Sequence, residues 1–340
     1  MNKRFMKRYV LIAVLFCSVL AAHAQADTDT LRARAQAFLI KGDYDNALLV
    51  LNHAAEMDAN NKDILRDEAY IYYLQRNYLK AIEIGKQITS RSDADVQGYQ
   101  VLGMAYKATA DYANADKLYK KALKQFPKSG VLYSEYGDML AQQNRQDEAI
   151  KLWEKGIQVD PNNSNNYYYA ARYYSSKGRP LWATVYSETF VNIESLTPRT
   201  VEIKDILLSN YRKLLTPGQL QALSQSNSAF EKAVANTYLK YTGMFDDELS
   251  PETLTAIRAR FILDWYAGGT APLAFRLFDH QRLLLEQGMF DAYNQWLFGA
   301  SASSSAYQYW TTNHSQEMKD WQTYLRSVVY KIPEGQYFQH

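Results

Sequence analysis

Residues 96–129 of this chain read VQGYQVLGMAYKATADYANADKLYKKALKQFPKS. Small residues stand at Gly103 and Ala115, and large side chains such as Tyr119 surround them. This alternation of small and large residues predicts two antiparallel helices that approach each other closely. Pro127 ends the second helix, because proline has no amide hydrogen and also restricts the residue before it. The stretch therefore predicts a helical hairpin.

The hairpin recurs along the chain with a spacing of 34 residues. Small residues fill two columns at this spacing: Ala35, Ala69, Gly103, Gly137 and Ala171 in the first, and Ala47, Ala81, Ala115, Ala149 and Ala183 in the second. A repeat array needs about three units to bury a continuous core. Five units in register therefore predict an all-α solenoid.

A more specific pattern lies in the same stretch, at Tyr99, Leu102, Gly103, Tyr106, Ala115, Tyr119, Ala122 and Pro127. With these residues the chain resembles tetratricopeptide repeat proteins, whose signature is W-x2-L-G-x2-Y…A-x3-F…P. Its layout is similar to exported repeat proteins of the Bacteroidetes type. The resemblance implies a right-handed stack of helix pairs whose concave face binds peptides or partner proteins.

Two of the five repeats depart from the pattern. Gly85 replaces an aromatic residue in the second repeat, so we expect its second helix to pack more loosely. The fifth repeat is degenerate, with Ser187 and Phe190 where an aromatic and a small residue are expected. Terminal units of an array are commonly atypical. We place the solenoid at residues 25–196.

The first 24 residues have the pattern of a secretory signal peptide. Basic residues precede the apolar run of residues 9–22, which ends in Ala22-His23-Ala24, an A-x-A cleavage site. The run is shorter than the roughly 20 residues that span a bilayer. We therefore predict a mature chain that begins at Gln25, is exported to the periplasm or cell envelope and keeps no membrane-spanning segment.

Cleavage changes the charge of the chain. It removes four of the 38 Lys and Arg residues and none of the 36 acidic residues, so the net charge goes from +2 to −2. Nucleic acid is not an expected partner of such a chain. The single cysteine, Cys17, lies within the signal segment. An exported product would contain no disulfide and no thiolate nucleophile.

Residues 197–340 lose the repeat spacing but still read as helical. Thr197-Pro198, Thr216-Pro217 and Ser250-Pro251 are typical helix starts, with a capping residue followed by proline. Apolar residues recur at helical spacing in two sets: Leu254, Ile257, Phe261 and Trp265, then Met318, Trp321, Leu325 and Val328. We expect a hairpin turn at Gln287-Gly288 and a loop over residues 301–305. This region is predicted to continue or cap the solenoid.

No residue pattern predicts catalysis, a cofactor or a metal site. The turns that begin at Asp58 and Asp160 lack the glycine and the glutamate of a calcium loop. Asp279-His280 has no second histidine nearby, which favours an ordinary surface or core histidine. The acidic run over residues 246–248 precedes a helix start, where acids are favoured electrostatically. We expect a non-catalytic protein, although an enzyme with an unrecognised site in residues 197–340 remains an alternative.

The repeat register predicts which residues of the first helices face the groove. Tyr99, Tyr106, Tyr119, Tyr133 and Tyr174 occupy structural positions in the core. Residues one turn either side of each small residue are predicted to bind a protein or peptide partner: Arg32, Gln36, Arg66, Tyr70, Tyr73, Gln100, Met104, Lys107, Ser134, Asp138, Tyr168 and Arg172. Carbohydrate binding through the tyrosines is the main alternative. The other possibility is a face that is only solvated or is covered by the C-terminal helices.

Overall fold

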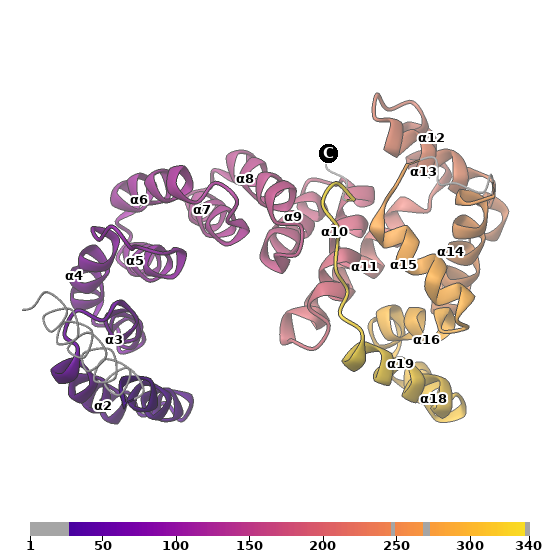
Figure 1. Ribbon diagram of the computed structural model, residues 1–340. Coiled ribbons are helices and arrows are strands. Elements are labelled where there is room, and N and C mark those ends of the chain that lie inside the picture. The colour runs from indigo at the N-terminus through magenta and orange to yellow at the C-terminus, as the bar shows by residue number, and fades with distance from the viewer. Residues whose placement is uncertain (1–26, 246–248, 268–272, 337–340) are drawn as a thin grey trace, which may run out of the picture. The chain divides into compact units, whose positions relative to one another are not determined.

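The computed structural model describes residues 27–245, 249–267 and 273–336 of the 340-residue chain. In these ranges every regular element is a helix, and successive helices pair as hairpins (Figure 1). The all-α class and the helical-hairpin solenoid predicted from the sequence are confirmed. The predicted signal peptide and the acidic run over residues 246–248 lie outside the described residues.

The chain forms two compact units, divided after Pro127. The N-terminal unit contains a helix over residues 27–40, followed by α2 (Tyr44–Met57), α3 (Lys62–Leu74), α4 (Tyr78–Thr89), α5 (Val96–Ala108) and α6 (Tyr112–Gln125). Within this unit, α3 and α5 lie along the inner side of a curved stack and α4 and α6 along its outer side (Figure 1). The second unit begins with four more repeat helices: α7 (Gly130–Gln142), α8 (Gln146–Val159), α9 (Ser164–Ser176) and α10 (Pro180–Ile193).

The two predicted columns of small residues are contact points between paired helices. All eight alanines in these columns are at most 2% exposed. A Cβ added to Gly103 would lie 2.3 Å from the hydroxyl of Tyr119, and one added to Gly137 would lie 2.3 Å from the indole nitrogen of Trp153. The small residues therefore make room for the large residues of the facing helix, and the predicted register is correct.

A third column, which the sequence analysis did not identify, fixes the turn inside each repeat. Gly42, Arg76, Ala110, Asn144 and Gly178 all have positive φ, and they are 34 residues apart. In the first three repeats the next residue is an Asp or Asn whose side chain accepts a hydrogen bond from the backbone of the following helix. The residue with positive φ ends the first helix, and the N-cap residue after it starts the second. Together they reverse the direction of the chain. This column includes the fifth repeat and so supports its assignment.

The predicted loose packing at Gly85 is wrong. Gly85 is buried against α5, and a Cβ there would lie 2.9 Å from the Cβ of Leu102. The glycine lets α4 and α5 approach closely, since the same Cβ would lie only 3.3 Å from the Cα of Leu102. The close approach of α4 and α5 thus fills the space that an aromatic side chain would otherwise occupy.

The degenerate fifth repeat is explained by what surrounds α10. Nearly every residue of α10 is buried, including Ser187 and Phe190, because α9, α11 and α15 all pack against it. A repeat helix ordinarily exposes one face, whereas α10 exposes none. The predicted boundary between a solenoid over residues 25–196 and a C-terminal region over residues 197–340 stays a prediction.

The C-terminal helices follow α10 in the same unit: α11 (Pro198–Leu214), α12 (Pro217–Ser224), α13 (Ala229–Leu239), the short 3-10 helix η1 (Thr242–Met244), α14 (Pro251–Trp265), α15 (Arg276–Glu286), α16 (Phe290–Asn294), the π-helix η2 (Gln295–Gly299), α17 (Ala300–Ala302), α18 (Ser304–Asn313) and α19 (Ser315–Ser327). The three predicted helix starts at proline are confirmed. The turn at Gly288 is confirmed as well, since its φ is +68°. None of the described helices combines the length and apolar content needed to cross a membrane.

Two sequence-based details of this region are wrong. Residues 301–305 are not a loop, because α17 and α18 fill the stretch and only Ser303 breaks the helical path, as the N-cap of α18. Val328 does not extend the buried face of α19. The helix ends at Ser327, and Val328 is 45% exposed at the start of an extended segment.

Candidate partner-binding site

The predicted binding residues of the N-terminal unit lie on its first helices. Arg32 and Gln36 are on the helix over residues 27–40, three more residues are on α3 and three on α5. All are half-buried except Gln36, which is exposed. The half-buried side chains contact both protein and solvent, and their assignment to a partner-binding face stays a prediction.

Ion pairs connect neighbouring first helices along this face. The Nε atom of Arg32 lies 2.9 Å from a carboxylate oxygen of Asp67. Arg66 lies 2.8 Å from Asp63 and 3.6 Å from Asp95 on the next repeat. Although burial opposes it, hydrogen bonds from the Gly98 amide and Lys62 hold the pKa of the Asp95 carboxyl below its usual value. The two arginines thus already bridge repeats.

Aromatic rings lie beside these charges. The Tyr70 and Tyr73 rings are stacked with centroids 6.4 Å apart, and Tyr73 also packs against Tyr78 at 5.8 Å. Both Tyr70 and Tyr73 keep part of their surface in solvent. Half-buried tyrosines are rigid and present an apolar ring with a polar end, which suits recognition of a partner.

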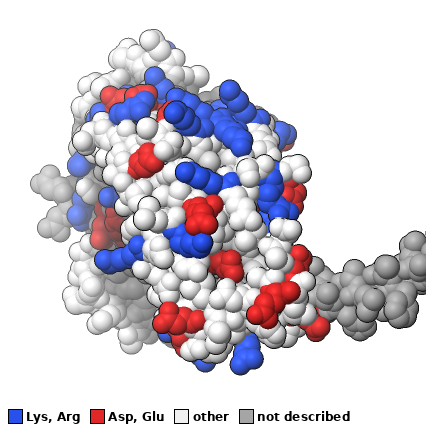
Figure 2. Space-filling model, turned by 90° about the vertical axis from the view of Figure 1, so that its left-hand side faces the viewer, with Lys and Arg blue, Asp and Glu red and all other residues white. Residues whose placement is uncertain are grey.

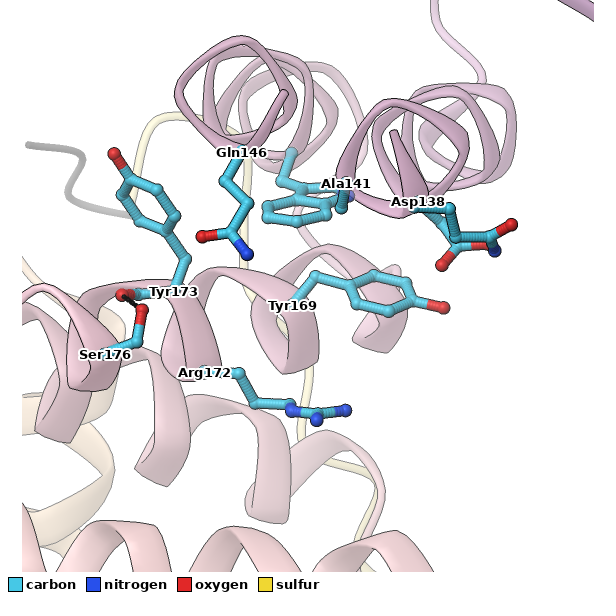
Figure 3. Close-up of a pocket in the computed structure, with 9 residues that line it drawn as sticks. Asp138, Ala141, Gln146, Tyr169, Arg172, Tyr173 and Ser176 are labelled. Atoms are coloured by element: carbon cyan, nitrogen blue, oxygen red, sulfur yellow. Dashed lines mark hydrogen bonds between the residues drawn. The ribbon is translucent and has the colours of Figure 1, made fainter. Parts of the chain in front are cut away.

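A pocket of about 340 Å³ lies in the second unit, between α7, α8 and α9 (Figure 3). The residues that line it are Asp138, Ala141, Gln142, Gln146, Trp153, Tyr169, Arg172, Tyr173 and Ser176. Two of the predicted binding residues, Asp138 and Arg172, are thereby brought to one site. The side chain of Gln146 points into the space between Tyr169 and Tyr173 (Figure 3).

The pocket combines a rigid aromatic wall with polar groups. Tyr169 stacks on Trp153 with ring centroids 5.1 Å apart. Trp153 is held in turn by a hydrogen bond from its indole nitrogen to the Ser134 carbonyl, at 3.4 Å. The Tyr173 hydroxyl donates to Asp147 at 2.8 Å, and burial together with this carboxylate raises the pKa of Tyr173 to about 12.

Two of the predicted groove residues are not open to a partner. Tyr168 is 7% exposed because α11 covers it, and its hydroxyl donates to Glu202 at 2.8 Å. Arg172 in turn donates to the Tyr168 hydroxyl at 2.9 Å. Ser134 is 1% exposed, and its hydroxyl donates to the Val131 carbonyl. The repeat register placed both residues correctly along their helices but could not show which neighbours cover them.

The repeat register does not predict the other pocket residues, above all Trp153, Tyr169, Tyr173 and Gln146. The dense tyrosines of residues 167–174 were the available signal, but the register alone does not show which of them line a pocket. Four of the five tyrosines assigned to the core are buried, and the fifth, Tyr133, is half-buried.

The described residues show no arrangement for metal binding. No group of three or more His, Cys, Asp or Glu side chains among them is placed to hold a metal ion. Asp58 accepts a hydrogen bond from Asn61 at 3.1 Å in the turn between α2 and α3. On the face shown in Figure 2, basic side chains gather over the upper part with a few acidic ones among them, and acidic side chains predominate over the lower part.

These repeats define the class of protein. Residues 32–95 and 101–165 match the family model described as Tetratricopeptide repeat. The matched segments cover the first four hairpins of the structure, with the small-residue columns and turns described above. This part of the chain has the tetratricopeptide repeat fold, which is typical of protein–protein interaction.

Several solved structures resemble the chain. TTC0263, a tetratricopeptide protein of Thermus thermophilus, is 19% identical, with a TM-score of 0.44 over 56% of this chain and 100% of its own. A structure of MamA is 22% identical, with a TM-score of 0.39 over 47% of this chain and 94% of its own. YrrB, described as a tetratricopeptide protein with an unusual peptide-binding site, is 16% identical, with a TM-score of 0.37 over 55% of this chain and 96% of its own. No curated protein matches the chain.

Proposed function

We propose that this chain is an exported, non-catalytic scaffold, of the type found in Bacteroidetes, that binds a protein or peptide partner of the cell envelope along the first helices of its repeats. The observation that carries the proposal is the inner side of the N-terminal unit, where half-buried tyrosines lie beside arginines that keep part of their surface in solvent. Tyr and Arg are enriched among residues that dominate binding energy at interfaces.

The charges on this face support a polar, extended partner. Arg32 and Arg66 form ion pairs with neighbouring acids at distances of 2.8–3.7 Å. These acids hold the two guanidinium groups in position, and a partner's carboxylate can take the place of one of them. Such preorganised side chains lose little conformational freedom on binding. The proposed partner is therefore a segment that carries both charged and apolar side chains.

Two experiments test the proposed function in sequence. Crosslinking in intact cells followed by mass spectrometry identifies partners whose crosslinks map to α3 and α5. Tyr70→Ala together with Tyr73→Ala is then expected to lower affinity for that partner about thirtyfold, if each ring contributes roughly 1 kcal/mol. Tyr309→Ala serves as the control, because Tyr309 is 75% exposed on α18. Undiminished binding by a folded double variant would show that the partner does not bind on this face.

A saccharide is the second candidate ligand, and the pocket between α7, α8 and α9 favours it. Its aromatic wall and its amide and carboxylate groups match a ligand with both apolar faces and hydroxyl groups. A panel of cell-envelope glycans is expected to raise the melting temperature of the wild-type chain but not of Tyr169→Ala. If no glycan raises the melting temperature of the wild-type chain, the pocket does not bind a saccharide and is assigned to the protein partner instead.

A further inference from the structure

A small cavity in the second unit lies outside the repeat face. It is formed by α15, α19 and the extended segment after α19, together with Asn192 on α10 and Ser195 just after it, and its volume is about 20 Å³. Roughly 10–15 Å³ is enough for one water-sized particle, so only a particle of about one atom fits without rearrangement. None of the described residues that line the cavity is acidic.

Three side chains of the cavity wall carry buried polar atoms without a hydrogen-bond partner. They are the Nδ1 atom of His280, the Nε1 atom of Trp321 and the hydroxyl of Tyr330. The three side chains are 3%, 0% and 8% exposed. Orphaned buried groups are rare in native proteins and commonly mark a bound water or ion. Three on one cavity wall therefore point to a ligand.

The chemistry of these atoms selects a hydrogen-bond acceptor. The indole N–H of Trp321 can only donate, the Tyr330 hydroxyl can donate, and His280 donates when its proton is on Nδ1. A ligand that offers several lone pairs satisfies all three at once. A carboxylate, phosphate or sulfate supplies lone pairs but exceeds the volume of the cavity.

The charge at the cavity favours an anion over water. Arg276 also lines it, and within the described ranges its side chain donates to the Lys331 carbonyl at 2.9 Å but pairs with no carboxylate. Its guanidinium lies 5.4 Å from the centre of the Tyr330 ring. Glu188 and Asp279 already have partners, because Glu188 pairs with Arg258 and Asp279 accepts from Tyr266. Arg276 thus provides a positive charge that has no protein counterpart in this part of the molecule.

We infer that the cavity binds one monatomic anion of the size of chloride, held by Trp321, Tyr330 and His280 and attracted by Arg276. The anion replaces the acceptors that the fold withholds from the three buried donors. It also neutralises the charge of the half-buried Arg276.

The anion connects the C-terminal segment to the helices beneath it. Tyr330 belongs to that segment, whereas His280 is on α15 and Trp321 on α19. Two residues later, the side-chain amide of Asn162 donates to the Ile332 carbonyl at 3.1 Å and accepts from the Ile332 amide at 2.8 Å. Loss of the anion therefore weakens one of the contacts that hold residues 328–336 in place.

Bromide tests the site directly. Crystals of the full chain grown in sodium bromide and measured at the bromine absorption edge are expected to show an anomalous peak in the cavity. Trp321 Nε1 and the Tyr330 hydroxyl should lie within about 3.5 Å of that peak, the usual upper limit for such contacts. Density for water alone, with no anomalous signal, overturns the inference.

Melting curves provide the second test. Sodium chloride is expected to raise the melting temperature by roughly 2–5 °C over sodium gluconate of equal ionic strength, when chloride is near ten times its Kd. Arg276→Gln and Tyr330→Phe should lose this rise, whereas Tyr324→Phe should keep it, because Tyr324 lines the same cavity but has no orphaned hydroxyl. Equal melting of the wild-type chain in the two salts overturns the inference without reference to any variant.

Discussion

The carboxylate of Glu188 accepts a hydrogen bond from the guanidinium of Arg258, and both side chains are 1% exposed. Glu188 is on α10, the second helix of the last repeat, and Arg258 is on α14. Gln281 and Tyr293 each donate to the same carboxylate at 2.7 Å, and Tyr211 donates at 3.1 Å. This network joins the last repeat to four C-terminal helices and explains why α10 carries a carboxylate on a face that is fully buried.

Removal of one member of this pair is expected to be costly. Arg258→Met leaves Glu188 as an uncompensated buried charge and should lower the free energy of unfolding by about 3–5 kcal/mol. Arg258→Met combined with Glu188→Leu should cost clearly less than the sum of the two single changes. Urea unfolding measures all three. Arg260→Met, an exposed change on the same helix, is the control, and an Arg258→Met variant as stable as that control would contradict the prediction.

The left-handed turn residues offer a stabilising substitution. Ala110 has a φ of +55° and is exposed, so a glycine there removes backbone strain without loss of a buried side chain. Ala110→Gly is expected to raise the free energy of unfolding by about 1 kcal/mol. Ala113→Gly, three residues later in α6, should lower it by about 0.5–1 kcal/mol. Changes of the same sign at the two positions would show that φ is not the cause.

Overpacking tests the small-residue column. Ala115 is 0% exposed where α6 meets its partner helix, so Ala115→Leu is expected to cost about 1–3 kcal/mol. Hydrogen exchange should show the loss of protection spreading from α5 and α6 to neighbouring repeats, because repeats stabilise each other. Ala113→Leu, on the exposed side of α6, is expected to stay within about 0.5 kcal/mol of wild type. Equal effects at the two positions would contradict the register.

His280 gives the stability of the second unit a predicted pH dependence. Burial, with a contribution from Arg276, lowers the pKa of His280 to about 3. In the unfolded chain the pKa is about 6.5, so the unfolded state binds the extra proton first as the pH falls. Stability should therefore be lost between about pH 6.5 and pH 3, by up to about 1.4 kcal/mol per pH unit.

The measurement is urea unfolding from pH 7 to pH 4 in sodium gluconate, which keeps halide from the neighbouring cavity. His280→Phe removes the titrating group and should flatten part of the curve. Acidic residues affect both proteins, so the difference between their curves isolates the histidine. Parallel curves would show that His280 takes up its proton equally in the folded and unfolded states.

The candidate site was predictable only in part. The repeat register placed Arg32, Tyr70 and Arg172 on first helices, because 34-residue spacing fixes the position of a residue within its hairpin. It did not show that α11 covers Tyr168, since that helix lies outside the repeat spacing. The aromatic pocket also escaped detection, because Trp153 and Tyr169 come from different repeats and meet only when the hairpins stack.

The sequence by itself determined the hairpins, their register and the starts of the C-terminal helices, since local signals encode all of these: small residues at fixed spacing, caps and prolines. Tertiary structure alone decided the burial of α10, the Glu188–Arg258 pair and the cavity beside Tyr330. In each of these, residues from distant parts of the chain meet, and Asn162 and Ile332 meet although they are 170 positions apart. Such contacts depend on how complete helices pack, and no periodic pattern in the chain specifies which side chain a distant helix will cover.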